Sequence, residues 1–268
     1  DGIMMKKTRS ILIATIMILS LTTLNSCQQK KAEEQPTAPE QASWIIDKFD
    51  DIKVLRYEVP GFENLPLQQK TLIYYLAQAT KAGRDILFDQ NFKYNLTVRR
   101  ALEAIYTKYD GDRNAAEFKA MEKYLKKVWF ANGIHHHYSN DKFRAEFPRE
   151  WFAQMVDKYV DPQELAIEKS LLLDIIFDPA LYPSRNVQAG VDDVLKASSM
   201  NYYEGLTQPE AEAFYAGMAA INDPRPISYG LNSKLVKKNG KIYEQTYKVG
   251  GMYSNALEQI CYWLEKAA

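Results

Sequence analysis

The chain has 268 residues, with 34 Lys and Arg against 34 Asp and Glu, so its formal net charge is zero, and 46% of its residues are hydrophobic. This composition is typical of a globular protein, and it excludes a chain that is disordered throughout, a collagen-like repeat and a small disulfide-stapled domain. Because there is no excess of basic residues, the composition gives no reason to expect nucleic-acid binding.

Residues 1–26 have the pattern of a secretory signal peptide. A short basic stretch precedes an apolar run over residues 11–24, which is shorter than the roughly 20 residues that a membrane-spanning helix needs. The run ends at Leu24-Asn25-Ser26-Cys27, which resembles a bacterial lipobox, although an ordinary signal with an incidental cysteine also fits. We expect Cys27 to be lipidated and residues 27–43 to be a flexible tether, so that the protein is anchored to a membrane of the bacterial cell envelope, facing the periplasm or the exterior.

A strand and a series of helices are predicted next. Residues 52–59 are rich in β-type side chains and stop at Pro60-Gly61, which predicts a strand. Apolar residues then recur at helical spacing, with proline or capping residues at several starts. The first predicted helix begins at Asn64, with Pro66 in its first turn. Further helices are predicted over 96–109, 114–130, 148–159, 161–177 and 207–221. The last of these opens with a capping box at Thr207-Gln208-Pro209-Glu210.

The C-terminal part changes to a β-type composition. Asn239-Gly240 lies between two such runs, and both residues tolerate positive φ, which predicts a β-hairpin with strands at 227–237 and 241–248. A final amphipathic helix is predicted over 254–268. The fold class that follows is α+β, predominantly helical with a β-hairpin or small β core, in one segment over residues 44–268.

Several residues of chemical interest are predicted to be structural. Cys261 lies among apolar residues without a histidine nearby, so we expect it to be a buried core residue rather than a nucleophile. The acidic pairs Asp192-Asp193 and Asp50-Asp51, with Asp47, are expected to be helix caps or solvated side chains. Aromatic residues expected in the core rather than in a recognition surface are Tyr74, Tyr75, Phe88, Phe92 and Tyr94.

All three histidines of the chain lie in the run His135-His136-His137. Adjacent residues do not converge easily on one ion, whereas metal-binding helices place histidines at i and i+4. We therefore predict no metal site here but a polar loop, either solvated or facing a substrate. The loop follows a helix stop at Gly133 and places one polar or aromatic side chain after another over residues 134–140, which is typical of ligand-binding loops.

Four segments resemble the N-terminal region of bacterial lipoprotein forms of the dipeptidyl peptidase III family. They are residues 52–62, 72–79, 131–148 and 243–254, and the similarity extends over most of 44–268. Members of this family are zinc exopeptidases that remove dipeptides from the N-terminus of oligopeptides. They have two lobes around a wide cleft, and their zinc is held by the two histidines of a His-Glu-x-x-Gly-His motif and by a glutamate of a later motif.

The resemblance implies that this chain is a part of the enzyme that does not contain the metal site. Neither zinc motif occurs in this sequence, so no catalytic or zinc-binding residue is carried over. The resemblance places the chain in the lower lobe, as scaffold of the substrate cleft, with the remainder of the peptidase chain as its partner. In relatives the lower lobe binds the peptide as an added β-strand. A polar and aromatic loop faces the cleft there, which makes His137, Tyr138 and Asn140 candidates for substrate contact.

Two other classes of protein remain open at this stage. A non-catalytic envelope lipoprotein that binds peptides or glycans would share the lipobox, the tether, the helices and the exposed aromatic residues. A purely structural assembly subunit would have a large exposed apolar patch.

Overall fold

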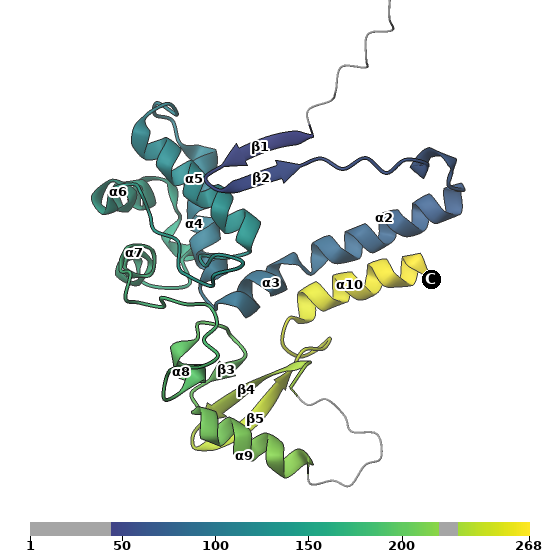
Figure 1. Cartoon of the computed structure of the whole chain (residues 1–268), viewed down its shortest axis with the longest axis vertical. Coiled ribbons are helices and arrows are strands. Elements are labelled where there is room, and N and C mark those ends of the chain that lie inside the picture. The colour runs from purple at the N-terminus through teal and green to yellow at the C-terminus, as the bar shows by residue number, and fades with distance from the viewer. Residues whose placement is uncertain (1–43, 220–229) are drawn as a thin grey trace, which may run out of the picture. The chain divides into compact units, whose positions relative to one another are not determined.

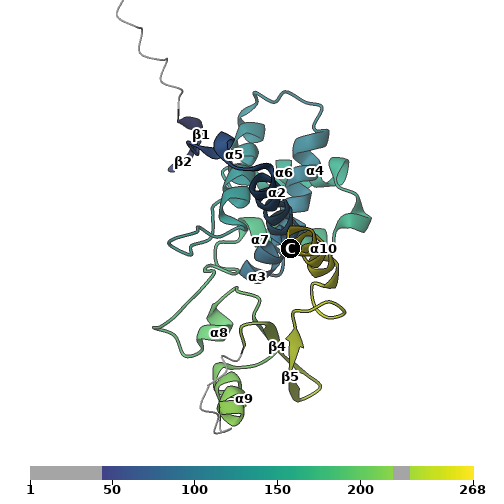
Figure 2. The same cartoon turned by 90° about the vertical axis from the view of Figure 1, so that its right-hand side faces the viewer.

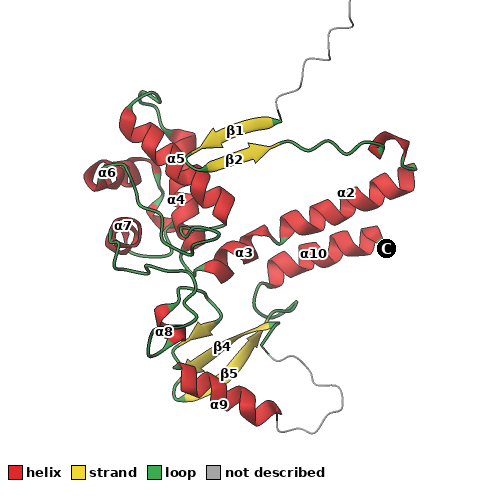
Figure 3. Ribbon diagram, viewed as in Figure 1, coloured by secondary structure: helices red, strands yellow, loops and turns green. Residues whose placement is uncertain are grey.

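The computed structural model describes residues 44–219 and 230–268 (Figure 1). The chain divides into two units, one formed by residues up to Lys48 with Lys53–Tyr57 and the other by Phe49–Ile52 with Glu58–Ala268. The predicted signal peptide over 1–26, the tether and Cys27 lie outside the described residues, and so does the predicted strand start at residue 227. Helices outnumber strands in the described part, as Figure 3 shows, and the fold class is α+β and predominantly helical.

The described part of the first unit contains most of two paired strands. Strand β1 (Ile45–Phe49) pairs with β2 (Ile52–Leu55), and the backbone N–H of Arg56 donates to the carbonyl of Trp44 at 2.7 Å. The sequence predicted the second strand but extended it to residue 59, and it missed β1. The charged pair Asp47-Lys48 breaks the apolar pattern of β1, and the turn depends on Asp50 adopting a left-handed conformation with φ of 52°.

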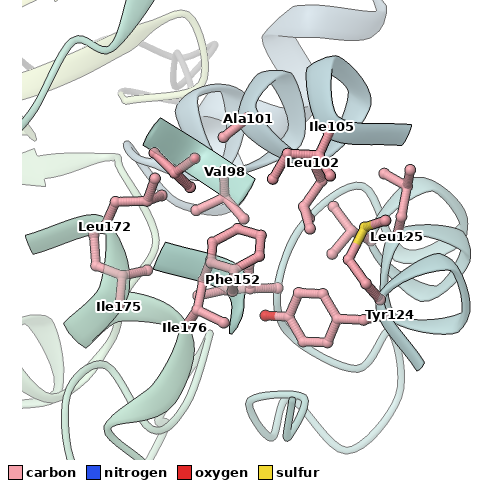
Figure 4. Close-up of a cluster of buried hydrophobic side chains, with 14 of the residues drawn as sticks. Val98, Ala101, Leu102, Ile105, Tyr124, Leu125, Phe152, Leu172, Ile175 and Ile176 are labelled. Atoms are coloured by element: carbon pink, nitrogen blue, oxygen red, sulfur yellow. The ribbon is translucent and has the colours of Figure 1, made fainter. Parts of the chain in front are cut away.

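Five helices of the second unit share one hydrophobic core. They are α3 (Arg84–Asn91), α4 (Asn95–Lys108), α5 (Ala116–Ala131), α6 (Arg149–Tyr159) and α7 (Lys169–Phe177). Figure 4 shows Leu102 of α4, Tyr124 of α5, Phe152 of α6 and Ile176 of α7 meeting in this core, where all four are buried. The predicted helices at 96–109, 114–130 and 148–159 are confirmed to within two residues at each end.

The helix predicted over 161–177 is wrong in its first half. Asp161 does cap a turn, because its carboxylate accepts from the N–H of Gln163 at 2.9 Å, but that turn is only a 3₁₀ helix, η2 (Pro162–Glu164). Leu165 and Ile167 then both pack against the helical core. Residues two apart share a face only in extended chain, so this segment cannot be helical and α7 begins later, at Lys169.

Helices α2 (Leu67–Ala82) and α10 (Ser254–Ala267) lie side by side, as Figures 1 and 2 both show. The ring of Trp263 stacks on Tyr75, with 6.1 Å between centroids. The predicted start at Asn64 is wrong, because Asn64 ends a separate 3₁₀ helix, η1 (Phe62–Asn64), and Pro66 is the N-cap of α2.

Cys261 of α10 and Tyr74 of α2 are exposed, which corrects the prediction that both are core residues. Ile260 and Trp263 lie on the side of α10 that meets α2 and Gly83. One residue along a helix turns the side chain by about 100°, so Cys261 is carried off that side. The prediction of a core position holds for Phe88 and Phe92, which are buried.

The remaining elements form a small sheet with two helices, which we call the β module. It comprises α8 (Val194–Ala197), β3 (Tyr203–Glu204), α9 (Gln208–Ala219), β4 (Ser233–Lys238) and β5 (Lys241–Thr246). The strand order is β3-β4-β5, with β3 parallel to β4 and β5 antiparallel to it.

Two local predictions are confirmed in the β module. The hairpin turns at Asn239-Gly240, where both residues have positive φ. The capping box is present at the start of α9, where the Glu210 carboxylate accepts from the N–H of Thr207 at 2.9 Å. Within the described ranges, no helix combines the length and the apolar character that crossing a membrane requires.

Candidate functional site

The predicted ligand loop is a short hairpin between α5 and α6. It follows Asn132, which caps α5 in a left-handed conformation, and it starts at Ile134 and returns at Phe143, both of which are buried. The N–H of Phe143 donates to the carbonyl of Ile134 at 2.8 Å, and that of His136 donates to the carbonyl of Asp141 at 2.7 Å. The two ends are therefore fixed in the core, and only the tip around Tyr138 projects.

The base of this loop is fixed by Asn95, which is fully buried at the start of α4. Its Oδ1 accepts from the N–H of Ile134 at 3.0 Å, and its Nδ2 donates to the carbonyl of Phe88 at 3.0 Å. Gly133 lies directly against this amide and has a φ of +150°. A Cβ at Gly133 would lie 2.1 Å from the Asn95 Nδ2, so only glycine fits here.

The tip of the loop is held by Arg185. Its Nε donates to the Asn140 Oδ1 at 3.0 Å and its Nη2 to the carbonyl of His137 at 3.2 Å. The backbone N–H of Arg185 donates to the carbonyl of Asn140 at 2.8 Å. Asn140 has a φ of 65°, a conformation that asparagine tolerates better than most residues. Among the predicted substrate-contact residues, Asn140 thus uses its side-chain oxygen for a hydrogen bond within the chain.

His135 is a core residue, which corrects the expectation of a polar loop position. It is 1% exposed, and its ring packs edge-on against Phe92. Its Nε2 donates to the carbonyl of Tyr182 at 3.0 Å, so Nε2 carries the proton of the neutral ring. The Nδ1 has no partner among the described residues. Burial lowers the pKa of His135 to about 4, so the ring is neutral at physiological pH.

The other two histidines have different partners. The Nδ1 of His136 accepts from the N–H groups of Tyr138 and Ser139, at 3.2 and 3.1 Å, while its Nε2 lies 3.6 Å from the Asp51 carboxylate. His137 packs between Phe130 and Tyr138, with ring centroids 5.0 and 4.3 Å away, and burial lowers its pKa. The rings of His136 and His137 also contact each other, with 4.5 Å between centroids, whereas His135 is held apart in the core. No group of three His, Cys, Asp or Glu in the described ranges could hold a metal ion.

Tyr138 lies at the tip of the loop, with 83% of its surface exposed. A shallow hollow of about 440 Å³ lies beside the loop and carries charges of both signs. On its wall, the Lys127 Nζ donates to Asp50 at 2.5 Å, and this hydrogen bond lowers the pKa of the Asp50 carboxyl. The hollow is lined by Asp50, Asp51, Lys127, His136, Ser139, Asp141, Lys142, Phe143, Arg144 and Glu146. An exposed aromatic ring on a braced loop beside charged groups is suited to binding a polar ligand with an apolar face.

Sequence reasoning missed three residues that build this site. Asn95 and Arg185 contact the loop from 39 and 45 positions away in the chain, and no local pattern marks either of them. Lys142 was missed as well. Its Nζ donates to the carbonyls of Asp178 and Leu181, at 2.5 and 2.6 Å, and burial lowers its pKa to about 8. The sequence did identify Tyr138, the exposed residue of the candidate site, and His137, whose ring packs against it.

Comparison with family models and with curated proteins gives no match to this chain. The resemblance to dipeptidyl peptidase III therefore stays a prediction.

We expect Asn95→Leu to lower the free energy of unfolding by about 2–4 kcal/mol. It keeps the side-chain volume but leaves the N–H of Ile134 unpaired in the core, while the carbonyl of Phe88 loses one bond and keeps the one from the N–H of Phe92. The matched control is Asn91→Leu, which removes one partly buried bond to the Asn132 carbonyl and should cost about 1 kcal/mol or less. Urea denaturation measures both, and equal costs would show that the Asn95 amide has no special role.

Stability should fall between pH 6.5 and pH 4 because of His135. In this window the His135 ring binds a proton in the unfolded chain and not in the folded chain, so lowering the pH favours unfolding. The free energy of unfolding should fall by about 1.4 kcal/mol per pH unit, and by up to about 3 kcal/mol over the whole window. His135→Gln should flatten this part of the stability profile. The control Ile134→Val, a buried neighbour, should lower stability by about 1 kcal/mol at every pH. An unchanged slope in His135→Gln would contradict the assignment.

Proposed function

We propose that this chain is the N-terminal part of a zinc-dependent dipeptidyl peptidase, in which it forms scaffold of the substrate cleft. The observation that carries the proposal is the apolar surface that helices α2 and α10 leave uncovered. It adds to the family resemblance of residues 52–62, 72–79, 131–148 and 243–254, which otherwise stands on sequence alone.

Helices α2 and α10 pack on each other and have little else beneath them. Ala79 is the one buried residue of α2, and α10 has none. Large apolar side chains remain exposed on both helices, namely Leu67, Leu72, Ile73, Tyr74, Leu76, Tyr262 and Leu264. Few charged residues offset these apolar side chains on α2, because its 16 residues include Lys70 and Lys81 and no acidic side chain. Such a surface is typical of one that more protein covers, either the rest of the same chain, as proposed here, or another protein, as in a structural assembly subunit.

The sheet of the β module has the same open character. Among the described strands, β5 pairs with β4 on one side and has no partner on the other. An open edge of this kind accepts a further strand, either from the same protein or from an extended peptide. In the proposed enzyme this fits the lower lobe, where the peptide substrate is bound as an added strand.

The zinc of the proposed enzyme does not fit the residues described here. In the family, zinc polarises the scissile carbonyl and activates a water. The His135 Nε2 donates to the carbonyl of Tyr182, and the His136 Nδ1 accepts from the loop backbone while its Nε2 lies 3.6 Å from Asp51. No group of three possible metal ligands occurs among the described residues. We therefore assign the metal to the remainder of the peptidase chain, and to this segment the binding and orientation of the oligopeptide.

A non-catalytic envelope lipoprotein that binds peptides or glycans is the second candidate. The exposed ring of Tyr138, which packs at a tilt against His137 and lies on the loop beside the hollow, supports it, because aromatic rings on rigid loops bind sugar and peptide ligands alike. Under both proposals the protein is held at the cell envelope by the lipid on Cys27, and its ligand is an oligopeptide or a glycan rather than nucleic acid.

The longest reading frame that contains this chain tests the first candidate. We expect it to encode a downstream His-Glu-x-x-Gly-His, and its product to hydrolyse dipeptidyl-arylamides until a chelator removes the zinc. The 268-residue chain alone should neither bind zinc tightly nor cleave these substrates. Chelator-sensitive turnover by the 268-residue chain, or a complete reading frame without the motif, would contradict the proposal.

The uncovered surface is tested in the same two proteins by Leu76→Lys on α2. In the longer protein it should destabilise, because the lysine meets covering protein, whereas in the 268-residue chain it should leave the melting temperature unchanged and reduce self-association. Leu87→Lys on α3 is the matched control, since Leu87 is 53% exposed against 43% for Leu76. A longer protein that tolerates both substitutions equally would mean that α2 is not covered.

Tyr138→Ala in the longer enzyme should raise KM about fivefold, a loss of roughly 1 kcal/mol of binding, with little change in kcat or in melting temperature. The reason is that the exposed ring is free to contact substrate and supports no buried group. Tyr57→Ala is the control, because Tyr57 is 82% exposed and should leave KM unchanged. A lowered melting temperature beside an unchanged KM would mean that Tyr138 serves the loop and not the substrate.

A further inference from the structure

A second hollow, which we call the α7 hollow, lies at the C-terminal end of α7. Its volume is about 620 Å³, which is within the range of small-molecule sites. It shares residues 141–144 with the hollow beside Tyr138, but its other walls come from the end of α7 and from Pro183. The charged residues of its lining are Asp141, Lys142 and Arg144, so two cations face one carboxylate.

The segment that carries these two cations is extended and fixed on both sides. The N–H of Lys142 donates to the carbonyl of Pro183 at 3.0 Å, and the N–H of Phe143 donates to the carbonyl of Ile134 at 2.8 Å. N–H groups that alternate between two neighbouring segments are typical of a strand, in which residues two apart share a face. Lys142 and Arg144 are therefore directed to one side of the segment, and the buried Phe143 to the other.

Lys142 is anchored at the end of α7 by neutral groups. Its Nζ donates to the carbonyls of Asp178 and Leu181, at 2.5 and 2.6 Å, and it forms no ion pair with the residues that the structure describes. Burial lowers the pKa of Lys142 to about 8, although the charge of the Asp178 carboxylate partly opposes this shift. An ammonium group has one N–H more than these two bonds use, so a donor remains for a ligand.

Arg144 is the accessible cation of the α7 hollow. It is exposed, and its guanidinium has no hydrogen-bond or ion-pair partner within residues 44–219 and 230–268. The next charged residues along the chain are paired, Glu146 with Lys123 and Arg149 with Asp174. A guanidinium presents its N–H donors as a planar fork, which matches the two oxygens of a carboxylate.

The apolar wall of the α7 hollow is fixed by the way α7 ends. Asp178 precedes Pro179 and takes an extended conformation with ψ of 110°, because a residue before proline avoids the helical region. The last turn of α7 therefore borders the hollow. Its Ile176 is buried, and its Phe177 is half-buried, with ring centroids 5.5 and 6.0 Å from two core phenylalanines. This rigid wall is suited to the apolar part of a ligand.

We propose that the α7 hollow binds the carboxylate of a small ligand that has an apolar side chain. Arg144 and Lys142 donate to the carboxylate, and the wall of Phe177, Pro179 and Pro183 contacts the side chain. The C-terminus of a peptide and a free apolar acid share this chemistry. The site uses this chain alone, so it does not depend on the proposed peptidase.

Calorimetric titration of the 268-residue chain tests the site with two acids and their amides. N-acetyl-phenylalanine represents a peptide C-terminus, and 3-phenylpropionate represents a free acid. We expect at least one acid to bind with a Kd below about 1 mM, and its amide to bind about tenfold more weakly, because the amide lacks the charge. The acid that binds more tightly identifies the source of the carboxylate. Failure of both acids to bind, or amides that bind equally well, would overturn the proposal.

Arg144→Gln should weaken binding of the acid about tenfold and leave the affinity for the amide unchanged, since it removes the charged donor from an exposed position. Arg144→Lys should recover part of the affinity, because it restores the charge without the planar fork. The matched control is Arg100→Gln on α4, which is also exposed and lies outside the lining of the hollow. An Arg144→Gln protein that binds the acid as tightly as the parent would overturn the site.

Acetylation of Lys142, followed by mass spectrometry, tests the second donor without a substitution. At a ligand concentration about tenfold above Kd, the bound acid should slow this acetylation about tenfold, because it covers the amine and favours the protonated form. Lys119 on α5 is exposed and should react at an unchanged rate. Equal acetylation of Lys142 with and without the bound acid would contradict its place in the site.

Discussion

The buried amide of Asn95 is the interaction on which both the helical core and the candidate site depend. It lies at the first residue of α4, and it binds the end of α3 through the carbonyl of Phe88 and the start of the loop through the N–H of Ile134. Burying an amide costs several kcal/mol unless its donors and acceptor are satisfied, so this residue fixes the geometry of everything that it contacts. Gly133 is required by the same packing, since no side chain fits between the loop and this amide.

From this base the loop gains rigidity without burying its tip. Arg185 holds the carbonyl of His137 and the side chain of Asn140, and the Nδ1 of His136 accepts from the tip backbone. Tyr138 is then presented on an ordered backbone while its ring stays in solvent. A ring on an ordered backbone would lose little entropy if a ligand covered it, which supports the proposal that Tyr138 contacts a ligand.

The sequence predicted those features whose cause is local. The turn at Asn239-Gly240, the box at Thr207 and Glu210, and the amphipathic run of α4 each depend on residues within one or two turns of each other. It failed where distant residues decide. His135 is buried because Tyr182 and Phe92 enclose it, Cys261 is exposed because α10 has only α2 to pack on, and Leu165 and Ile167 are extended because both reach the helical core. The composition of the loop marked it as a candidate site, but nothing in the sequence marked the residues that hold it, Asn95 and Arg185.

The apolar surface of α2 and α10 and the loop tip at Tyr138 have opposite requirements for solvent, and together they support the proposed architecture. The exposed apolar residues of α2 and α10 form a surface of the kind that marks contact with further protein, and α2 carries two lysines and no acidic residue. The loop tip at Tyr138 and the charged residues of the hollow beside it can bind a ligand only if they stay accessible to solvent. A small binding protein requires the second surface but has no need of the first. The proposed segment of a larger lobed enzyme would use both, because its helices would pack on the rest of the enzyme while its loop faced the cleft.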